Sequence, residues 1–231
     1  MQVYLLEDAL DLWEATIKAT PAPAPQGLLD LVTYLLPCVE IGTLTLRKAL
    51  DIIESYVILA PREMIEVHRA GMFDAFASLQ GALKPEANGI VTNVVEIVIR
   101  AAEALGGEQA LSVVGNELIR SGFLPTLLEG IEKSHQAHQT TGPNKQYAPL
   151  ETIVMTDYFS VLSRMVLAST TMFVENVRVC AERKGRTIGS DMEWVLEEWF
   201  RHVRLLTSDT KNLLLGYMLV ATGVDVKWWV I

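Results

Sequence analysis

Residues 46–57 read LRKALDIIESYV, and their apolar side chains at Leu46, Leu50, Ile53 and Val57 are separated by four, three and four positions. In an α-helix this spacing places all four side chains on one face. The charged and polar residues between them then point away from that face. The stretch therefore predicts an amphipathic helix that buries one side against a neighbour.

Apolar residues three or four positions apart recur at four other places in the chain. The four further stripes are Leu28, Val32, Leu35 and Val39; Ile90, Val94, Ile97 and Ala101; Val154, Tyr158, Val161 and Met165; and Met192, Val195, Trp199, Val203 and Leu206. No run of β-branched residues with clean alternation lies beside an Asn-Gly or Asp-Gly turn. The sequence therefore predicts an all-α protein.

Proline, glycine and polar residues mark the expected helix ends, because they fit poorly inside a helix or cap its termini. The expected breaks are TPAPAP at 20–25, Gly42-Thr43, Pro61 before a long helix ending near Leu83, Lys84-Pro85-Glu86, Gly106-Gly107 and Gly122. Residues His138 to Pro149 form the longest polar stretch, which we expect to be a flexible loop. A second loop is expected from Arg183 to Ser190.

The expected helix pairs start near Val3, Thr43 and Pro85, which lie 40 and then 42 residues apart. This period fits a HEAT-like solenoid of antiparallel helix pairs stacked into a superhelix. We expect a single segment, 1–231, of about five pairs at 1–42, 43–84, 85–149, 150–207 and 208–231, the last one incomplete. One compact multi-helix bundle is the alternative architecture.

Composition limits the classes of partner. There are 28 acidic residues against 19 Lys and Arg, and the formal charge of −9 would repel a nucleic-acid backbone. Mean hydropathy is +0.27, which raises the question of a membrane span, but the sequence has no stretch of about 20 uncharged apolar residues. A signal peptide is not expected either, because Glu7, Asp8 and Asp11 lie where its apolar stretch would be. The two cysteines, Cys38 and Cys180, lie far apart without a metal-binding companion. We expect a protein of a reducing compartment that neither enters a membrane nor binds nucleic acid directly.

A test for enzyme chemistry finds one partial motif. Glu132 and His135 have the Glu-x-x-His spacing of a di-metal helix bundle, with His138 three positions on, but such a site needs a second Glu-x-x-His. No nucleophile motif or phosphate-binding loop is present. We expect no catalytic residues, no metal and no cofactor, and we place His135 and His138 on the surface at the mouth of the polar loop.

Three stretches resemble a known family. They are EDALDLW at 7–13 followed by the proline-rich break, LTLR at 44–47 with IIESY at 52–56, and DMEWVLEEWFRHVRLLTSD at 191–209, whose Trp199 matches a tryptophan of the family's last repeat. The chain resembles the C-terminal part of importin-β-type karyopherins, specifically the importin-eleven branch, over nearly its whole length.

The resemblance implies a HEAT-repeat nuclear transport receptor that carries protein cargo and shuttles between cytoplasm and nucleus. The Ran GTPase and Phe-Gly nucleoporins would be partners of the full-length protein, of which this chain would be a fragment. The alternative function is a helical-repeat scaffold in another assembly. We expect Trp228 and Trp229 to be exposed or covered by a neighbouring molecule, unless the tail folds onto its own last repeat.

By analogy with the family, the second helix of each pair faces inward, which places 121–138 and 191–206 on the concave side. Their carboxylates Glu129, Glu132, Glu193 and Glu197 are then possible contacts for basic cargo. The competing interpretation is a solvated charged face, with Glu197 pairing to Arg201 four positions on. A Met-rich stretch, Met155, Phe159, Met165, Met172 and Phe173, could line a groove for Phe-Gly repeats, but its helical spacing favours core packing.

Overall fold

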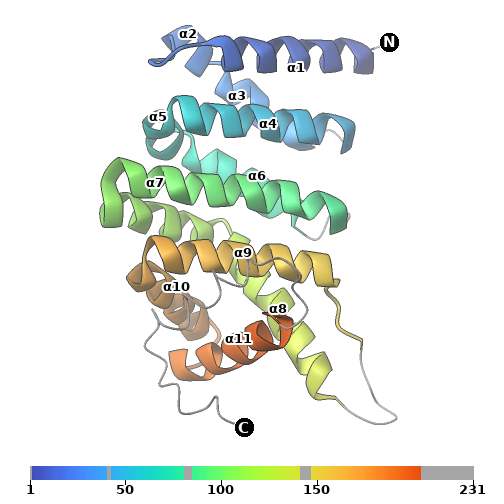
Figure 1. Ribbon diagram of the computed structural model, residues 1–231, viewed down its shortest axis with the longest axis vertical. Coiled ribbons are helices and arrows are strands. Elements are labelled where there is room, and N and C mark those ends of the chain that lie inside the picture. Colours follow the sequence, from blue (N-terminus) through green and yellow to red (C-terminus); the bar gives the residue numbers. More distant parts are fainter. Residues whose placement is uncertain (1, 41–42, 81–84, 141–146, 204–231) are drawn as a thin grey trace. The chain divides into compact units, whose positions relative to one another are not determined.

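The computed structural model describes residues 2–40, 43–80, 85–140 and 147–203. Every regular element in these ranges is helical, and they fall into two compact units, 1–127 and 128–231. Within each unit, helices pack side by side in pairs (Figure 1). The prediction of an all-α helical-repeat fold is confirmed.

In the first unit, three long helices lie in one layer. They are α1 (Gln2–Ala19), α4 (Thr43–Leu59) and the part of α7 (Pro85–Arg120) that precedes its break at Gly106-Gly107, with α1 packed on α4 and α4 on α7 (Figure 1). Short helices supply the second layer: α2 (Gln26–Leu29), α3 (Val32–Leu35), the 3-10 helix η1 (Leu36–Glu40), α5 (Pro61–Glu66) and α6 (Arg69–Leu79). The long helices begin roughly 40 residues apart, the spacing typical of stacked two-helix repeats.

The stripe in α4 forms the centre of this unit. Leu46, Leu50, Ile53 and Val57 are all buried, as predicted. Because α4 has a neighbour on each side, Tyr56 is buried as well, and its hydroxyl donates to the Leu28 carbonyl at 2.7 Å while accepting the Trp13 indole N–H at 2.9 Å. These bonds satisfy a polar atom that burial would otherwise destabilise.

Two of the expected helices are broken. The stripe from Leu28 to Val39 is buried as predicted, but α2, α3 and η1 replace one helix, and Pro37 lies inside η1. A proline cannot donate the backbone hydrogen bond that an α-helix requires there. The helix expected from Pro61 to near Leu83 is likewise split, between α5 and α6 at Val67-His68.

The predicted stripe of α7 is displaced. Ile90, Ile97 and Ala101 are only half-buried, whereas the buried set is Val91, Val94, Val95, Val98, Ile99 and Ala102. The helix packs against both α4 and the short helices α5 and α6. A helix with neighbours on two sides buries a wider arc than a single stripe.

Two glycine signals fall where a helix must turn. The backbone leaves helical geometry inside α7 at Gly106 and Gly107, and Gly107 has a φ of 53°. Gly122, with a φ of 87°, precedes α8 (Phe123–Gln139). The expected breaks at Gly106-Gly107 and Gly122 are therefore confirmed. Glycine suits Gly107 and Gly122 because a positive φ is costly for residues with a Cβ.

The second unit contains most of α8 together with α9 (Thr152–Ala168), α10 (Thr170–Arg183) and α11 (Ile188–Val203). α10 packs against both α9 and α11. The core of the second unit includes Phe159 and Trp199, whose ring centroids lie 5.0 Å apart. The Ser169 hydroxyl caps α10 by accepting the Met172 N–H at 3.0 Å. The Met-rich stretch is buried throughout, at Met155, Phe159, Met165, Met172 and Phe173, which confirms core packing.

The two expected loops have different bounds from those predicted. α8 continues to Gln139, so His138 is helical, and α9 begins only at Thr152. α11 begins at Ile188, which leaves only residues 184–187 as the linker between α10 and α11. The fifth pair, with Trp228 and Trp229, lies outside the described residues. The division into five pairs and the single-segment organisation stay predictions.

Candidate protein-binding surface

The four acidic residues predicted to contact cargo all lie in the second unit, Glu129 and Glu132 on α8, and Glu193 and Glu197 on α11. Three of them are exposed. Glu129 forms an ion pair with Lys133 one turn on, at 2.6 Å, which leaves the Glu129 side chain 51% exposed. Glu129, Glu193 and Glu197 are therefore accessible to a partner.

Glu132 has a different environment, because its side chain is only 13% exposed and is bound by two cations. Arg186 donates to both carboxylate oxygens, and Lys184 donates at 2.8 Å. The hydrogen bond from Arg186 is the main reason that the pKa of Glu132 falls to about 2. Arg186 also binds the buried Asp191, with Nη2 3.1 Å from Oδ2. Glu132 thus ties α8 to the 184–187 linker and is already neutralised.

The prediction of surface placement fails for His135, whose side chain is only 12% exposed. It lies against Glu198 of α11, a carboxylate that is 1% exposed. His135 Nδ1 is 3.4 Å from Glu198 Oε2, and His138 Nδ1 is 2.7 Å from Glu198 Oε1. Two imidazoles therefore provide the polar partners that a buried carboxylate requires. The sequence did not reveal this pairing because it depends on how α8 packs against α11.

The ion pairs around Glu198 and His135 also differ from expectation. Arg201 lies 3.7 Å from Glu198, whereas Glu197 faces His135 Nε2 at 3.7 Å. The predicted pair between Glu197 and Arg201 is therefore replaced. Glu132 and His135 bind different partners, and within the described ranges no group of three or more His, Cys, Asp and Glu side chains is arranged to hold a metal ion.

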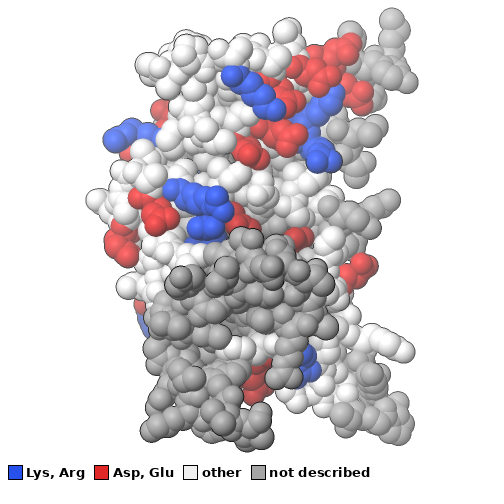
Figure 2. Space-filling view, viewed as in Figure 1, with Lys and Arg blue, Asp and Glu red and all other residues white. Residues whose placement is uncertain are grey.

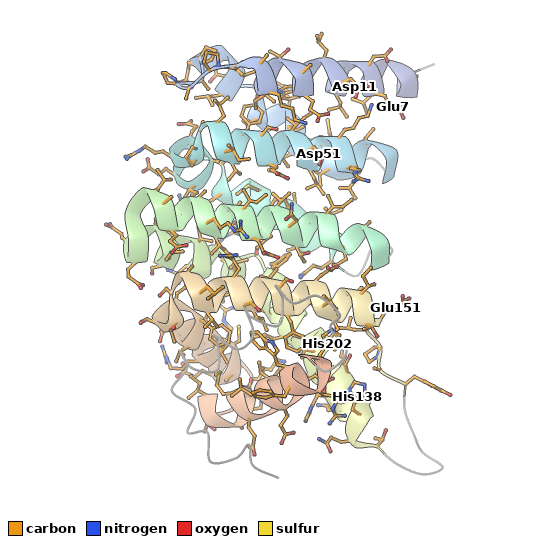
Figure 3. All side chains as sticks on the ribbon, in the orientation of Figure 1. Glu7, Asp11, Asp51, His138, Glu151 and His202 are labelled. Atoms are coloured by element: carbon orange, nitrogen blue, oxygen red, sulfur yellow. The ribbon has the colours of Figure 1, made fainter. Side chains whose placement is uncertain are left out.

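A larger acidic surface, which the sequence reasoning missed, lies on the first unit. We call it the acidic α1–α4 face, formed by Glu7, Asp8, Asp11 and Glu14 of α1 with Asp51 and Glu54 of α4. Figure 2 shows acidic side chains gathered over these two helices, and Figure 3 marks Glu7, Asp11 and Asp51. The carboxylates on each helix recur at helical spacing, but their union into one surface requires knowing that α1 packs on α4.

The acidic α1–α4 face is only partly neutralised. Lys48 binds Asp11 at 2.5 Å, Lys18 binds Glu14, and Arg47 is the third basic residue among the six carboxylates. Burial and the nearby Glu14 raise the pKa of Asp51, while burial and Asp51 raise the pKa of Glu54. Burial is the larger cause of both shifts, and repulsion between neighbouring carboxylates adds to it. The surface is therefore suited to a positively charged partner.

The first unit also has a groove of about 330 Å³ beside the break in α7. Ile65, Leu105 and Val113 line it together with Arg62, Arg69 and Gln109. A site of this size and mixed polarity fits one or two side chains of a partner. No helix among the described residues is both long and apolar enough to cross a membrane.

Comparison with known proteins agrees with the helical-repeat architecture. Residues 1–216 match the family model described as importin-11-like, TPR repeats. The chain is 24% identical over 219 residues to Importin-11 of Homo sapiens and to Importin-11 of Mus musculus, an alignment that covers 95% of this chain and 20% of each relative. The chain thus spans about a fifth of the length of these relatives, and no solved structure matches it significantly.

The family description names TPR repeats, where the sequence suggested HEAT-like ones. Both names denote stacked antiparallel helix pairs, and the roughly 40-residue spacing of the long helices is closer to HEAT repeats than to the 34 residues of TPR repeats. The family match covers most of the chain, and its helical pairs fit the described structure. The chain belongs to the importin-11-like repeat family.

Proposed function

We propose that this chain is a protein-binding segment of a nuclear transport receptor that carries protein cargo between cytoplasm and nucleus. The observation that carries the proposal is the match to the importin-11-like family over residues 1–216. The family implies a transport receptor and not an enzyme. Ran-dependent exchange and contact with Phe-Gly nucleoporins would be properties of the whole receptor, since the chain spans only a fifth of its relatives.

Basic cargo is the class of partner that the described surfaces favour. The acidic α1–α4 face holds three more carboxylates than basic side chains. A cationic segment would relieve the repulsion that adds to burial in raising the pKa of Asp51 and Glu54. Electrostatic attraction of this kind speeds association and weakens with added salt. Glu129, Glu193 and Glu197 are a second set of candidate contacts. Glu132 is a weaker candidate because Arg186 and Lys184 already bind it.

The receptor function is tested on the full-length protein that contains this segment. Immobilised receptor is incubated with nuclear proteins, with and without Ran loaded with GTP, and separately with a Phe-Gly repeat peptide. A receptor binds the repeat peptide and releases its cargo when Ran-GTP is added. A full-length protein that ignores both Ran-GTP and Phe-Gly repeats would instead be a helical-repeat scaffold, the alternative function.

The acidic α1–α4 face is tested by charge reversal at exposed positions. Asp8→Lys together with Asp11→Lys removes two carboxylates and adds two cations, and should abolish the salt-sensitive part of cargo binding. The matched control reverses Asp30 and Glu103, exposed acids of the same unit outside this face. Equal binding by both double variants would show that net charge, and not this surface, attracts the cargo.

A further inference from the structure

The linker between α10 and α11 combines a basic run with an exposed hydroxyl. Arg183 ends α10, Lys184 and Arg186 follow it, and Thr187 directly precedes α11. Arg183, Lys184 and Thr187 are all exposed. Three cations therefore lie at four, three and one positions before an accessible phosphoryl acceptor.

We propose that Thr187 is a phosphorylation site for a protein kinase that selects basic sequences. Such kinases choose substrates by charge pattern, placing carboxylates of their own opposite cations that precede the acceptor. In the transfer, the Thr187 Oγ1 loses its proton to a base of the kinase and forms a bond to the γ-phosphorus of Mg-ATP. The bond from that phosphorus to the β,γ-bridging oxygen breaks, and ADP leaves.

The local hydrogen bonds favour Thr187 over its neighbour Ser190. The Thr187 hydroxyl oxygen accepts a long bond of 3.4 Å from the Ser190 N–H. The Ser190 hydroxyl, by contrast, donates to the Thr187 carbonyl at 2.8 Å. Ser190 also lacks a cation three positions before it, where Thr187 itself stands. Both the charge pattern and the hydrogen bonding therefore select Thr187.

A phosphate at Thr187 would enter an existing ion network. Arg186, the preceding residue, bridges Glu132 of α8 and Asp191 of α11, and Lys184 also binds Glu132. A phosphothreonine carries a charge of about −1.5 to −2 and three strong acceptor oxygens. It competes with the Glu132 carboxylate for Arg186 and Lys184, so that phosphorylation releases the tie between α8 and the linker.

The site is tested by incubating the whole chain with Mg-ATP and with kinases that require a basic residue three positions before the acceptor. Peptide mass spectrometry identifies the residues that are modified. Phosphate on Thr187 is expected in the wild type and in Ser190→Ala, and must be absent in Thr187→Ala. Lys184→Gln should lower kcat/KM about tenfold, as expected for loss of one charged contact, whereas Glu132→Gln, which removes the partner of Lys184 but keeps the cation, should not. Thr187→Ser keeps the hydroxyl and should be modified, which guards against a folding defect in the alanine variant.

Several results would overturn the proposal. One is a folded chain left unmodified while a synthetic peptide of residues 181–192 is phosphorylated, because Thr187 would then be inaccessible. Modification confined to another hydroxyl, or insensitive to Lys184→Gln, would do the same. The exchange of partners is read from the carboxyl ¹³C signal of Glu132: its pKa should rise from about 2 towards the ordinary value after phosphorylation, and an unchanged titration would refute the release.

Discussion

The ion network around Glu132 gives a quantitative prediction. Glu132→Gln removes the charge while keeping the side-chain shape, so Arg186 and Lys184 lose their shared partner. A fall in the Glu132 pKa from 4.5 to about 2 corresponds to about 3 kcal/mol. Water screens the exposed Lys184 side of the network, which reduces the expected loss of unfolding free energy to about 1–2 kcal/mol at pH 7.

The pH dependence of this loss follows from the direction of the shift. A carboxyl group whose pKa is lower in the folded than in the unfolded state stabilises the fold above the unfolded pKa, and this stabilisation disappears as the pH falls towards the folded pKa. The difference between wild type and Glu132→Gln should therefore be constant above pH 5 and shrink between pH 4.5 and about 2.

Urea unfolding followed by tryptophan fluorescence measures both effects, because Trp194 and Trp199 lie on α11 in the same unit. Glu129→Gln is the matched control on the same helix, since its exposed pair with Lys133 should contribute only about 0.5 kcal/mol or less. Equal losses for the two variants, or a Glu132→Gln effect that does not shrink below pH 4.5, would refute the role assigned to this network.

Three further substitutions test the packing. Tyr56→Phe removes the hydroxyl shared by Leu28 and Trp13 and should destabilise the first unit by about 1–2 kcal/mol in urea unfolding; no change would mean that water replaces these bonds. Trp199→Ala should cost about 3–5 kcal/mol, because the side chain is 3% exposed, and a loss below 1 kcal/mol would contradict its place in the core. Gly122→Ala should lower stability by about 1–2 kcal/mol, because residue 122 has a positive φ, and the loss is measured as a lower thermal midpoint. A stabilised variant would contradict the positive φ assigned to this residue.

The sequence predicted the helices well, and it predicted the buried stripe of α4 although that helix has a neighbour on each side. The stripe through Leu46 and Val57 is buried as expected. In α7 the predicted stripe is offset, because that helix packs on two sides and Val91 and Val98 are buried where Ile90 and Ile97 were expected. Periodicity alone identifies a helix but does not show how many neighbours it has.

The candidate sites were harder to predict than the fold. Glu132 looked like an exposed carboxylate because the two cations that bind it, Lys184 and Arg186, lie more than 50 residues away in the sequence. His135 seemed to lie on the surface for the same reason, since its partner Glu198 comes from α11. Partners brought together by helix packing leave no local signal in a single sequence.

The central claim, that this chain is a cargo-binding segment of a transport receptor, is tested most directly by zero-length cross-linking. Carbodiimide joins carboxylates to amines that touch them, and is applied to the full-length receptor with its co-purified cargo, with and without Ran-GTP. We predict cargo lysines joined to Asp8, Asp11 or Asp51 in the absence of Ran-GTP, and their loss when it is added. Cargo that cross-links elsewhere on the receptor and never within residues 1–231 would contradict the account.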